Sequence, residues 1–315
     1  MKEELKKYKT VIMGTPEFAV KPFSALISDS RFEVVLAVSQ PDKKVGRKQI
    51  IKTTPIKKLA QENNIEVAQP EKIKDIEEKL KNLKADILVV IAYGKILPQS
   101  ILNIFNHGAI NVHGSLLPKY RGSSCMQAAI LNDDKESGVT IMLMDAGMDT
   151  GDILKQFKVN INDKETISTL HDKLSELSAK ALPDTLIEYI RGDIKPQKQD
   201  ADKASTVKML NKEDGHLNFN KTANYIDRQV RALNPWPSTF AKLGDNYLKI
   251  LETGSIIKTD QPHEIGELFF NNNSLFVQVK DRAIEIKKLQ VSGKKPATKE
   301  NIISGYKHLK RKVLQ

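Results

Sequence analysis

The sequence is poor in cysteine and in long apolar runs. Only one cysteine, Cys125, occurs in 315 residues, which excludes a disulfide framework and a multi-cysteine zinc site and favours a reducing compartment. A lone cysteine is usually buried and neutral, and we expect this of Cys125 rather than a nucleophilic role. The N-terminus mixes acidic and basic residues with no apolar core behind it. We therefore expect no signal peptide, no membrane span and a cytoplasmic location.

Several catalytic motifs are also missing. The glycine after the first expected strand lacks the G-x-G-x-x-G spacing of dinucleotide-binding loops, and no Walker loop occurs. His113-Gly-Ser115 does not fit the elbow of serine hydrolases. Asp145, Asp149 and Asp152 do not fit the calcium-loop pattern. We therefore expect no dinucleotide cofactor, no serine nucleophile and no metal.

The chain is basic, with a formal net charge of +11. Residues 206–315 contain 19 Lys and Arg against 11 Asp and Glu, which is +8 of that total. Residues 40–58 form a second cluster, with seven basic residues against one acid. Basic excess in one domain and one loop indicates a polyanionic partner such as nucleic acid. A lysine-rich proteome would give the same composition, so charge alone leaves both explanations open.

The first 190 residues alternate strand and helix patterns. Apolar runs predict strands at 8–13, 32–38, 85–92, 108–113 and 138–144. Helical patterns lie between them, at about 17–28 and from Pro55, and a long amphipathic helix covers 167–190. This alternation predicts an α/β domain with a mostly parallel sheet and helices on both faces. Pro183 should kink or split the long helix.

The C-terminal part has a different period. Residues 191–207 are polar and lack periodicity, which predicts an interdomain linker. Short strands follow at 238–243, 247–251, 275–279 and 283–286, with one helix at 222–233. Several short strands with little helix predict a small basic β-barrel of the oligonucleotide-binding (OB-like) type. We thus expect a catalytic domain at 1–190, a linker at 191–207 and a barrel at 208–315.

The most informative run is Asn111-Val-His113-Gly-Ser115-Leu-Leu-Pro118. Alternate residues of a strand share a face, so an amide and an imidazole should emerge together from the strand at 108–113. In open α/β sheets, chemistry lies at the carboxyl ends of the strands. A flexible acidic loop with Asp149 follows the strand at 138–144. Amide, imidazole and carboxylate together suit acyl transfer to an amine without a covalent intermediate.

These motifs resemble the folate-dependent formyltransferases over nearly the whole chain. The resemblance lies in Gly14-Thr-Pro-Glu-Phe18, Gln40-Pro-Asp42, Val89–Pro98, Ile110–Gly122, Gly138–Asp152 and Asn234-Pro-Trp-Pro237. The Gln-Pro-Asp loop, the Asn-Pro-Trp-Pro run and the basic C-terminal domain are similar to the branch that formylates methionine on initiator tRNA.

The resemblance implies a Rossmann-like N-terminal domain that binds 10-formyltetrahydrofolate as co-substrate, and a C-terminal barrel that binds the acceptor arm of initiator methionyl-tRNA. It implies that Asn111, His113 and Asp149 are the catalytic trio. The folate-binding loop falls on Ser115, Leu116, Leu117 and Pro118, and the wall around the pterin falls on Ala92, Tyr93, Gly94 and Ile96. The implied enzyme acts in translation initiation, without a metal or membrane, as a monomer.

The sequence departs from the family pattern in two places. After Gln-Pro-Asp the family usually has arginine and proline and then a Gly-Arg-Gly run, where this chain has Lys43-Lys-Val and Gly46-Arg47-Lys48. Lysine does not reproduce the fork of a guanidinium, so the residue that replaces the family's arginine is left open among the basic residues of this loop. The predicted tRNA contacts are Lys43, Arg47 and Lys48. The family usually has Ala-Ala-Pro after Arg-Gly, and this chain has Ser123-Ser-Cys125.

The expected mechanism is attack of the methionine amine on the formyl carbon. Asn111 and His113 would donate hydrogen bonds to the oxyanion, and Asp149 would orient His113 and move the proton. Three alternatives remain open from the sequence. They are formyl transfer to a nucleotide-sugar amine, a folate-dependent hydrolase that releases formate, and an RNA-binding module in which the trio is structural.

Overall fold

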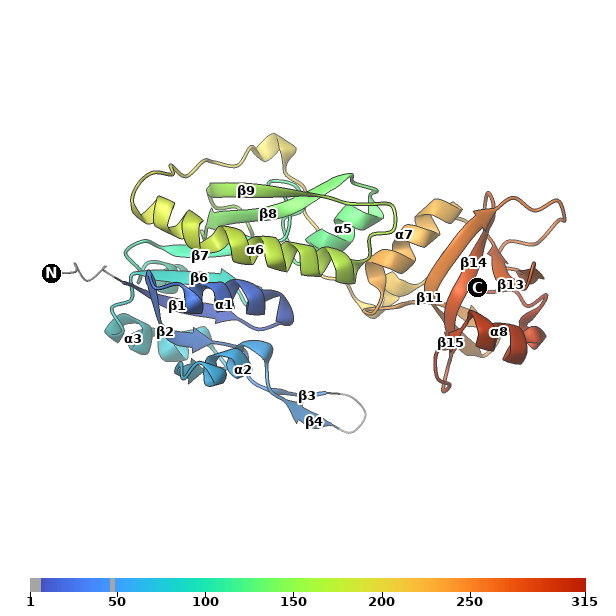
Figure 1. Ribbon diagram of the computed structural model, residues 1–315, viewed down its shortest axis with the longest axis horizontal. Helices are drawn as coiled ribbons and strands as arrows, with labels where there is room; N and C mark the ends of the chain where they lie inside the picture. Colours follow the sequence, from blue (N-terminus) through green and yellow to red (C-terminus); the bar gives the residue numbers. More distant parts are fainter. Residues whose placement is uncertain (1–6, 46–48) are drawn as a thin grey trace. The chain divides into compact units, whose positions relative to one another are not determined.

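The computed structural model describes residues 7–45 and 49–315 (Figure 1). The chain divides into two compact units. Unit 1 comprises Met1–Cys125, Glu136–Asn160 and His171–Val207, and unit 2 comprises Met126–Lys135, Ile161–Leu170 and Lys208–Gln315. No helix within the described residues is both long and apolar enough to cross a bilayer.

Unit 1 is built on a seven-stranded sheet in the order β5-β2-β1-β6-β7-β8-β9. The first five strands of that order are parallel, and β8 and β9 are antiparallel to their neighbours. The strands are β1 (Tyr8–Gly14), β2 (Phe32–Val38), β5 (Val67–Ala68), β6 (Ile87–Ile91), β7 (Ala109–His113), β8 (Glu136–Leu143) and β9 (Ile153–Asn160). The five strands expected in this region are confirmed, and the mostly parallel sheet with them.

The apolar runs of the central strands β1 and β6 are buried on both faces. All five residues of β6 are buried, as expected for a central parallel strand covered on both sides. Val11 and Met13 of β1 belong to one core cluster with Leu88 and Val90 of β6. The intervening Ile12 and Val89 are also fully buried, so the opposite face is covered too.

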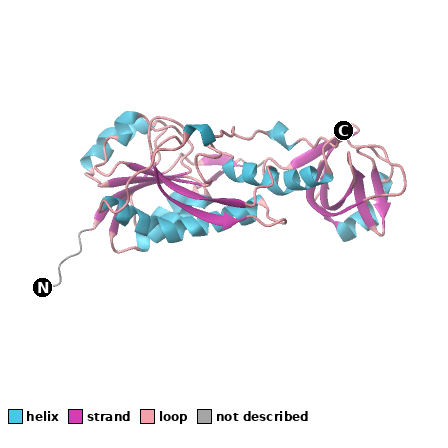
Figure 2. Ribbon diagram, turned by 90° about the horizontal axis from the view of Figure 1, so that it is seen from above, coloured by secondary structure: helices cyan, strands magenta, loops and turns pink. Residues whose placement is uncertain are grey.

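Helices lie on both faces of this sheet (Figure 2). The helices of unit 1 are α1 (Val20–Ser28), α2 (Pro55–Glu62), α3 (Glu77–Asn82), α4 (Gln99–Leu102) and most of α6 (Ile167–Ile190), with short 3-10 turns at Glu17–Ala19 and Ile73–Ile76. Helix α5 (Cys125–Leu131) belongs to unit 2 from Met126 onward. Helix α2 begins as predicted, because Pro55 follows Thr54, whose hydroxyl accepts the Lys57 N–H.

The expectation that Pro183 could split the long helix is wrong. Helix α6 is continuous over 24 residues with Pro183 inside it. Leu182, Leu186 and Ile187 around the proline are buried, and this burial offsets the cost of the missing N–H.

A short antiparallel hairpin, β3 (Lys43–Val45) and β4 (Ile50–Lys52), projects from the body of unit 1 (Figure 1). Lys43 pairs directly with Lys52 in this hairpin. Ile50 and Ile51 are among the most exposed large apolar side chains of the described residues.

Unit 2 contains an antiparallel sheet in the order β10-β11-β14-β13-β12, with β15 paired to β14. Its strands are β10 (Thr239–Leu243), β11 (Asn246–Ile257), β12 (Leu268–Asn271), β13 (Ser274–Gln278), β14 (Ala283–Val291) and β15 (Ala297–Thr298). Its helices are α7 (Ala223–Leu233) and α8 (Lys299–Gly305), with 3-10 turns at Lys212–Gly215 and Lys307–Leu309. The expected strands and helix of this region are confirmed.

The chain end lies between the two outer strands of this sheet. The backbones of Lys242 in β10 and Gln315 bond to each other, and Leu268 in β12 bonds to Arg311 and Lys312. Ile226 and Val230 of α7 pack on Leu248 and Ile250 in one core cluster. The antiparallel sheet of the C-terminal domain is thus shown, and its classification as an OB-like barrel stays a prediction.

The polar segment 191–207 is held on unit 1 by backbone hydrogen bonds. Gln197 and Ile153 exchange two such bonds, of 2.8 and 2.9 Å. Further along, Ser205 and Val207 bond to the backbone of Pro118 and Arg121. A short 3-10 turn, Ala201–Lys203, lies between these contacts. We call residues 191–207 the linker segment below.

Candidate functional site

A cavity of about 150 Å³ lies beside β7 in unit 1. It is lined by the segment after β6, by Asn111 of β7, by the end of β8 and by the loop that joins β8 to β9. The lining residues are Lys95, Ile96, Leu97, Asn111, Met142, Met144 and residues 145–149. Strand ends of an open α/β sheet are where ligands bind, and this is the region that the Asn-x-His motif predicted.

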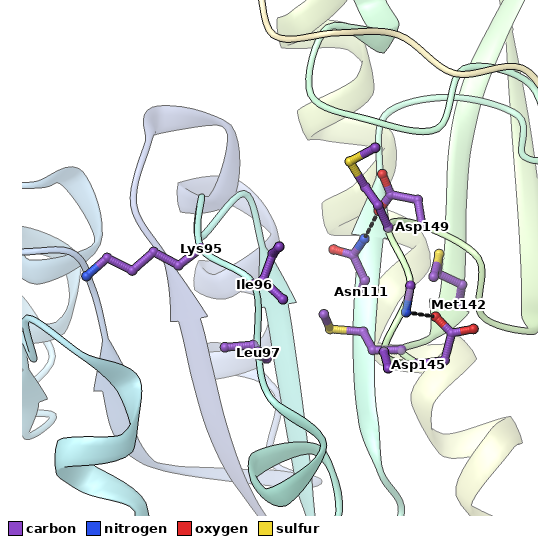
Figure 3. Close-up of a pocket in the computed structure, with 11 residues that line it drawn as sticks. Lys95, Ile96, Leu97, Asn111, Met142, Asp145 and Asp149 are labelled. Atoms are coloured by element: carbon purple, nitrogen blue, oxygen red, sulfur yellow. Dashed lines mark hydrogen bonds between the residues drawn. The ribbon is translucent and has the colours of Figure 1, made fainter.

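The cavity has apolar walls with a polar group on one side. Figure 3 shows Ile96 and Leu97 across the cavity from Asn111 and Asp149, with the ammonium group of Lys95 pointing away. Ile96 is 85% exposed and Met148 is 59% exposed. Exposed apolar side chains at a concave site are typical of ligand surfaces. The walls offer apolar surface to a ligand, and Asn111 and Asp149 offer an amide and a carboxylate beside it.

The structure brings Asn111, His113 and Asp149 together. The Nδ2 of Asn111 donates to Oδ1 of Asp149 over 3.3 Å, and Nδ1 of His113 lies 3.6 Å from Oδ2 of Asp149. Asn111 and Asp149 line the cavity, while His113 is buried behind them. An Asn amide has two N–H donors, so one remains for a ligand when the other contacts Asp149.

His113 is surrounded by acceptors. Its Nε2 lies 3.0 Å from the carbonyl oxygen of Tyr120, which can only accept, so this nitrogen carries a proton. Burial opposes the charged ring, but the Cys125 sulfur, the Asp149 carboxylate and the Tyr120 carbonyl outweigh it and raise the pKa of His113 to about 9. The direction of this shift favours the imidazolium.

Asp149 is fixed by the loop that follows β7. Its Oδ2 accepts the backbone N–H of Gly122 over 2.8 Å. Its own backbone has a φ of +54°, a left-handed conformation that residues other than glycine seldom adopt. The carboxylate is therefore aimed at Asn111 and His113 by a backbone that must be held in place.

The four residues expected to bind folate after Gly114 do not line this cavity. The hydroxyl of Ser115 donates to Lys119 O within the same loop over 2.7 Å, and Leu117 is buried. Leu116 packs against Gly138, and the carbonyl of Pro118 accepts from Ser205. The loop supports the Tyr120 carbonyl and the Gly122 N–H, and the folate-binding role of Ser115, Leu116, Leu117 and Pro118 stays a prediction.

The expected pterin wall is only partly at the cavity. Ile96 lines it. The ring of Tyr93 is buried in the main core cluster of unit 1 instead, and its carbonyl accepts from Gln40 Nε2 over 2.7 Å. Ala92 and Gly94 on either side have positive φ values of +49° and +80°, so this segment turns sharply before it reaches the cavity.

Of the three predicted tRNA contacts, the structure describes Lys43. Lys43 begins β3 and is exposed. Arg47 and Lys48 lie outside the described residues.

Unit 2 contains a larger groove of about 1020 Å³. Five cationic side chains line it, against three acidic ones: Lys164, Arg231, Lys249, Lys287 and Lys288 against Asp163, Asp227 and Glu252. Arg231 is paired with Asp227. Across the described parts of the chain, the four lysines have no carboxylate within ion-pair distance.

Sequence reasoning missed several residues of the site. Met142 lies opposite Asn111 in the β7–β8 pairing, a position that the alternation of the strand could have indicated. The backbone groups of Tyr120 and Gly122 gave no signal, because any residue type carries them. Gln199 contacts the Asp149 loop from 50 residues away in a segment that looked like a plain linker. Within residues 7–45 and 49–315 no cluster of three or more His, Cys, Asp or Glu could hold a metal ion.

Comparison with known families matches both halves of the chain. Residues 6–186 match the family described as formyl transferase, and residues 209–307 match the formyl transferase C-terminal domain. A methionyl-tRNA formyltransferase of Caldicellulosiruptor saccharolyticus is 41% identical, over 96% of this chain and 99% of that protein. Another from Clostridium novyi is 39% identical, over 94% and 96%.

Solved structures share the fold at lower identity. An N-formyltransferase from Helicobacter canadensis, in complex with folinic acid and dTDP-3-aminofucose, has a TM-score of 0.65 at 22% identity and covers 89% of this chain and 98% of that one. HypX from Aquifex aeolicus, in complex with tetrahydrofolic acid, has a TM-score of 0.62 at 14% identity and covers 96% of this chain and 48% of that one.

Proposed function

This chain belongs to the formyl transferase family, and we propose that it transfers the formyl group of 10-formyltetrahydrofolate to the α-amino group of methionine on initiator tRNA. The observation that supports this function most strongly is the near-full-length similarity to methionyl-tRNA formyltransferases. The cluster of Asn111, His113 and Asp149 beside an apolar cavity supports the same chemistry. The enzyme would act in translation initiation.

The cavity residues fit a folate co-substrate. Ile96 and Met148 offer apolar surface to a pterin ring, and Asn111 and Asp149 offer a donor and a carboxylate to the formyl-bearing end. The folate supplies the formyl group already activated on N10, so the protein needs to supply only positioning and charge stabilisation. The proposal also includes the loop Ser115–Pro118 as a folate-binding loop, and Ala92, Tyr93 and Gly94 as part of the wall around the pterin.

The reaction exchanges one C–N bond for another. The neutral methionine amine attacks the formyl carbon, a new C–N bond forms, and negative charge develops on the formyl oxygen. The free N–H of Asn111 donates to that oxygen, and a preorganised donor of this kind contributes ~10²–10³-fold in rate. The bond from the formyl carbon to N10 then breaks, and N10 takes up a proton as tetrahydrofolate leaves.

Asp149 transfers the proton during this exchange, and His113 stabilises the charge. The α-amino group has a reference pKa of about 7.7–8.0, so part of it is already neutral near pH 7. The protein therefore needs no strong base to form the nucleophile. Asp149 accepts the proton that the attacking amine loses and passes it to N10. His113 does not line the cavity. As an imidazolium behind Asp149, it orients the carboxylate and adds positive potential next to the oxyanion.

We place the tRNA on basic surfaces of both units. The unpaired lysines of the unit 2 groove, Lys164, Lys249, Lys287 and Lys288, suit phosphate contacts. The hairpin β3–β4 supplies Lys43 opposite Lys52. Like charges placed opposite each other in a hairpin cost stability, and an anionic partner would relieve that cost. The proposal also includes a catalytic domain at residues 1–190, a linker at 191–207 and an OB-like barrel at 208–315.

Transfer of radiolabelled formyl from 10-formyltetrahydrofolate is the experiment that tests the function. Charged initiator tRNA, uncharged tRNA and a 4-amino nucleotide sugar are offered in parallel. We expect label on the charged tRNA alone. Label on the sugar, or free formate without an acceptor, would keep the chemistry of the trio and overturn the tRNA substrate. RNA retention without any transfer would overturn the enzyme.

A further inference from the structure

The linker segment is bonded to both loops that hold the trio. Ser205 contacts the loop after β7, with its Oγ accepting from Tyr120 N over 2.9 Å and its carbonyl accepting from Arg121 N over 2.8 Å. That loop carries the Tyr120 carbonyl and the Gly122 N–H of the site. All of these residues belong to unit 1.

Gln199 connects the loop after β7 to the loop between β8 and β9, which carries Asp149. Its Nε2 donates to the backbone carbonyls of Asp149 and Gly151, each over 2.8 Å. Its Oε1 accepts from Nε and Nη2 of Arg121, over 3.0 and 2.8 Å. Both N–H groups of the amide and its oxygen are used, so the side chain has one orientation.

The carbonyl that Gln199 binds belongs to a strained residue. The left-handed backbone of Asp149 costs free energy and persists only where its surroundings hold it. Residues 145–148, before it, are exposed and stay ordered through local bonds from Gly147 and Thr150 to Asp145. The two bonds from Gln199 fix the peptide groups of Asp149 and Gly151, and with them the direction of the carboxylate.

We infer that Gln199 is a positioning residue for the transfer reaction, which holds the Asp149 carboxylate against Asn111, His113 and the Gly122 N–H. The inference rests on the proposed function for its kinetic consequence. It assigns the linker segment a part in the active site beyond connecting two units. Arg121 supports it by fixing the amide of Gln199, and does not touch the trio itself.

Replacement of Gln199 by methionine removes all four bonds at nearly constant volume. We expect kcat to fall about 10- to 100-fold with both KM values within twofold, because a displacement of about 1 Å in a reacting group costs up to 10²-fold. The pKa of His113 should also fall from about 9, since the carboxylate that helps raise it moves away. The variant leaves both titratable neighbours of that ring, Asp149 and Cys125, unchanged.

Gln197→Met is the matched control. Gln197 lies in the same segment, is exposed, and bonds to Ile153 only through its backbone. Its variant should keep kcat and the His113 titration. A second test variant, Gln199→Glu, keeps the acceptor for Arg121 and faces the two carbonyls with an oxygen. It should lose at least as much kcat as Gln199→Met.

The outcomes separate the inference from the proposed function. Wild-type kcat and an unshifted His113 titration in Gln199→Met would overturn the positioning role, as would an equal loss in Gln197→Met. If the native enzyme transfers no formyl group, the proposed function fails. The His113 titration, followed by NMR on histidine-labelled protein, still tests whether Gln199 holds Asp149.

Discussion

At the scale of single residues, the charge of the site is concentrated on His113 and Asp149. His113 is buried and close to three groups that favour its protonated form. Asp149 is held by a backbone amide, an amide side chain and the imidazolium. The departure from the family pattern at Ser123–Cys125 places a thiol next to this ring, so Cys125 adjusts the pKa of His113 without being a nucleophile in the proposed reaction.

We predict that His113 titrates near pH 9 in the native chain. Its folded pKa lies above the unfolded value of about 6.5. The stability it contributes is therefore complete below about pH 6.5 and is lost as the pH rises through about 9. NMR of histidine-labelled protein, with the signal assigned by its loss in His113→Gln, measures the titration. The pKa should fall in Cys125→Ala; a value near 6.5 in the native chain would contradict this account.

Replacement of Asp149 by asparagine should abolish most of the rate. We expect kcat to fall at least ~10²-fold, because the proton acceptor is lost, while folate binding changes little. Single-turnover formyl transfer and a folate binding titration measure the two effects. Asp152→Asn, on the same loop, is the control and should keep its rate. Near-native turnover in Asp149→Asn would exclude the assigned role.

The sequence predicted the side chains of the trio better than their supports. Asn111 and His113 share a strand face, and alternation alone predicts that they lie together. The turn that brings Asp149 back to β7 depends on the Gly122 N–H and on Gln199, and no local pattern encodes contacts of 27 and 50 residues' separation. The sequence also predicted that His113 donates directly to the oxyanion. The folded site adds that the ring is buried and does not line the cavity, and the direct donation stays a prediction.

At the scale of elements, strand β14 contains a buried carboxylate in unit 2. Glu285 accepts from the backbone N–H and the hydroxyl of Ser255 on β11, over 3.0 and 2.9 Å, and from Lys299 over 3.2 Å. Burial opposes ionisation, but the bonds from Ser255, Ser274 and Lys299 outweigh it and lower the pKa of Glu285 to about 2. Ser255 thus ties the irregular part of β11 to its neighbour.

We predict that Glu285→Gln destabilises the chain by about 1–3 kcal/mol, since buried donors lose a charged acceptor. The folded pKa is below the unfolded one, so this contribution is present above about pH 4.5 and is lost as the pH falls toward 2. Urea unfolding followed by the fluorescence of Trp236, which lies in unit 2, measures it at pH 7 and at pH 3. Glu252→Gln, an exposed carboxylate on β11, should have no such effect, and equal losses in both variants would refute the prediction.

Strands with strong apolar runs could be predicted from the sequence, and the edge strand β9 could not. Strand β6 and most of β1 are buried on both faces, and β1, β2 and β6 lie where the sequence predicts them, within one or two residues. Strand β9 is half exposed, so its apolar signal is weak. The continuity of α6 through Pro183 depends on tertiary burial, which local propensity does not contain.

At the scale of the whole molecule, the net charge of +11 is concentrated on surfaces that suit a polyanion. The groove of unit 2 and the hairpin of unit 1 both present lysines. Phosphate contacts release counterions, so binding through them weakens steeply with salt. Binding of the proposed folate co-substrate in the largely apolar cavity does not depend on such contacts.

We therefore predict a steep increase in KM for the tRNA with salt and a nearly constant KM for folate. Replacing Lys287 and Lys288 by glutamine should reduce the slope of log(kcat/KM) against log salt by about 1 for each phosphate that is no longer neutralised. Steady-state kinetics from low to moderate potassium chloride measure it. The double variant of Lys79 and Lys180, lysines of unit 1 already paired with carboxylates, should keep the native slope. An unchanged slope in the groove variant would remove the groove from the tRNA surface.

The hydrogen bonds of the linker segment also decide where this protein can be cut and recombined. A fragment that ends after α6, at Ile190, would lose Gln199 and Ser205 and with them the bonds that fix the Asp149 loop. Chimeras that exchange the C-terminal part between relatives should be joined after Val207, so that the catalytic domain keeps its own linker segment. A join at residue 190 would transplant part of one enzyme's active site into another.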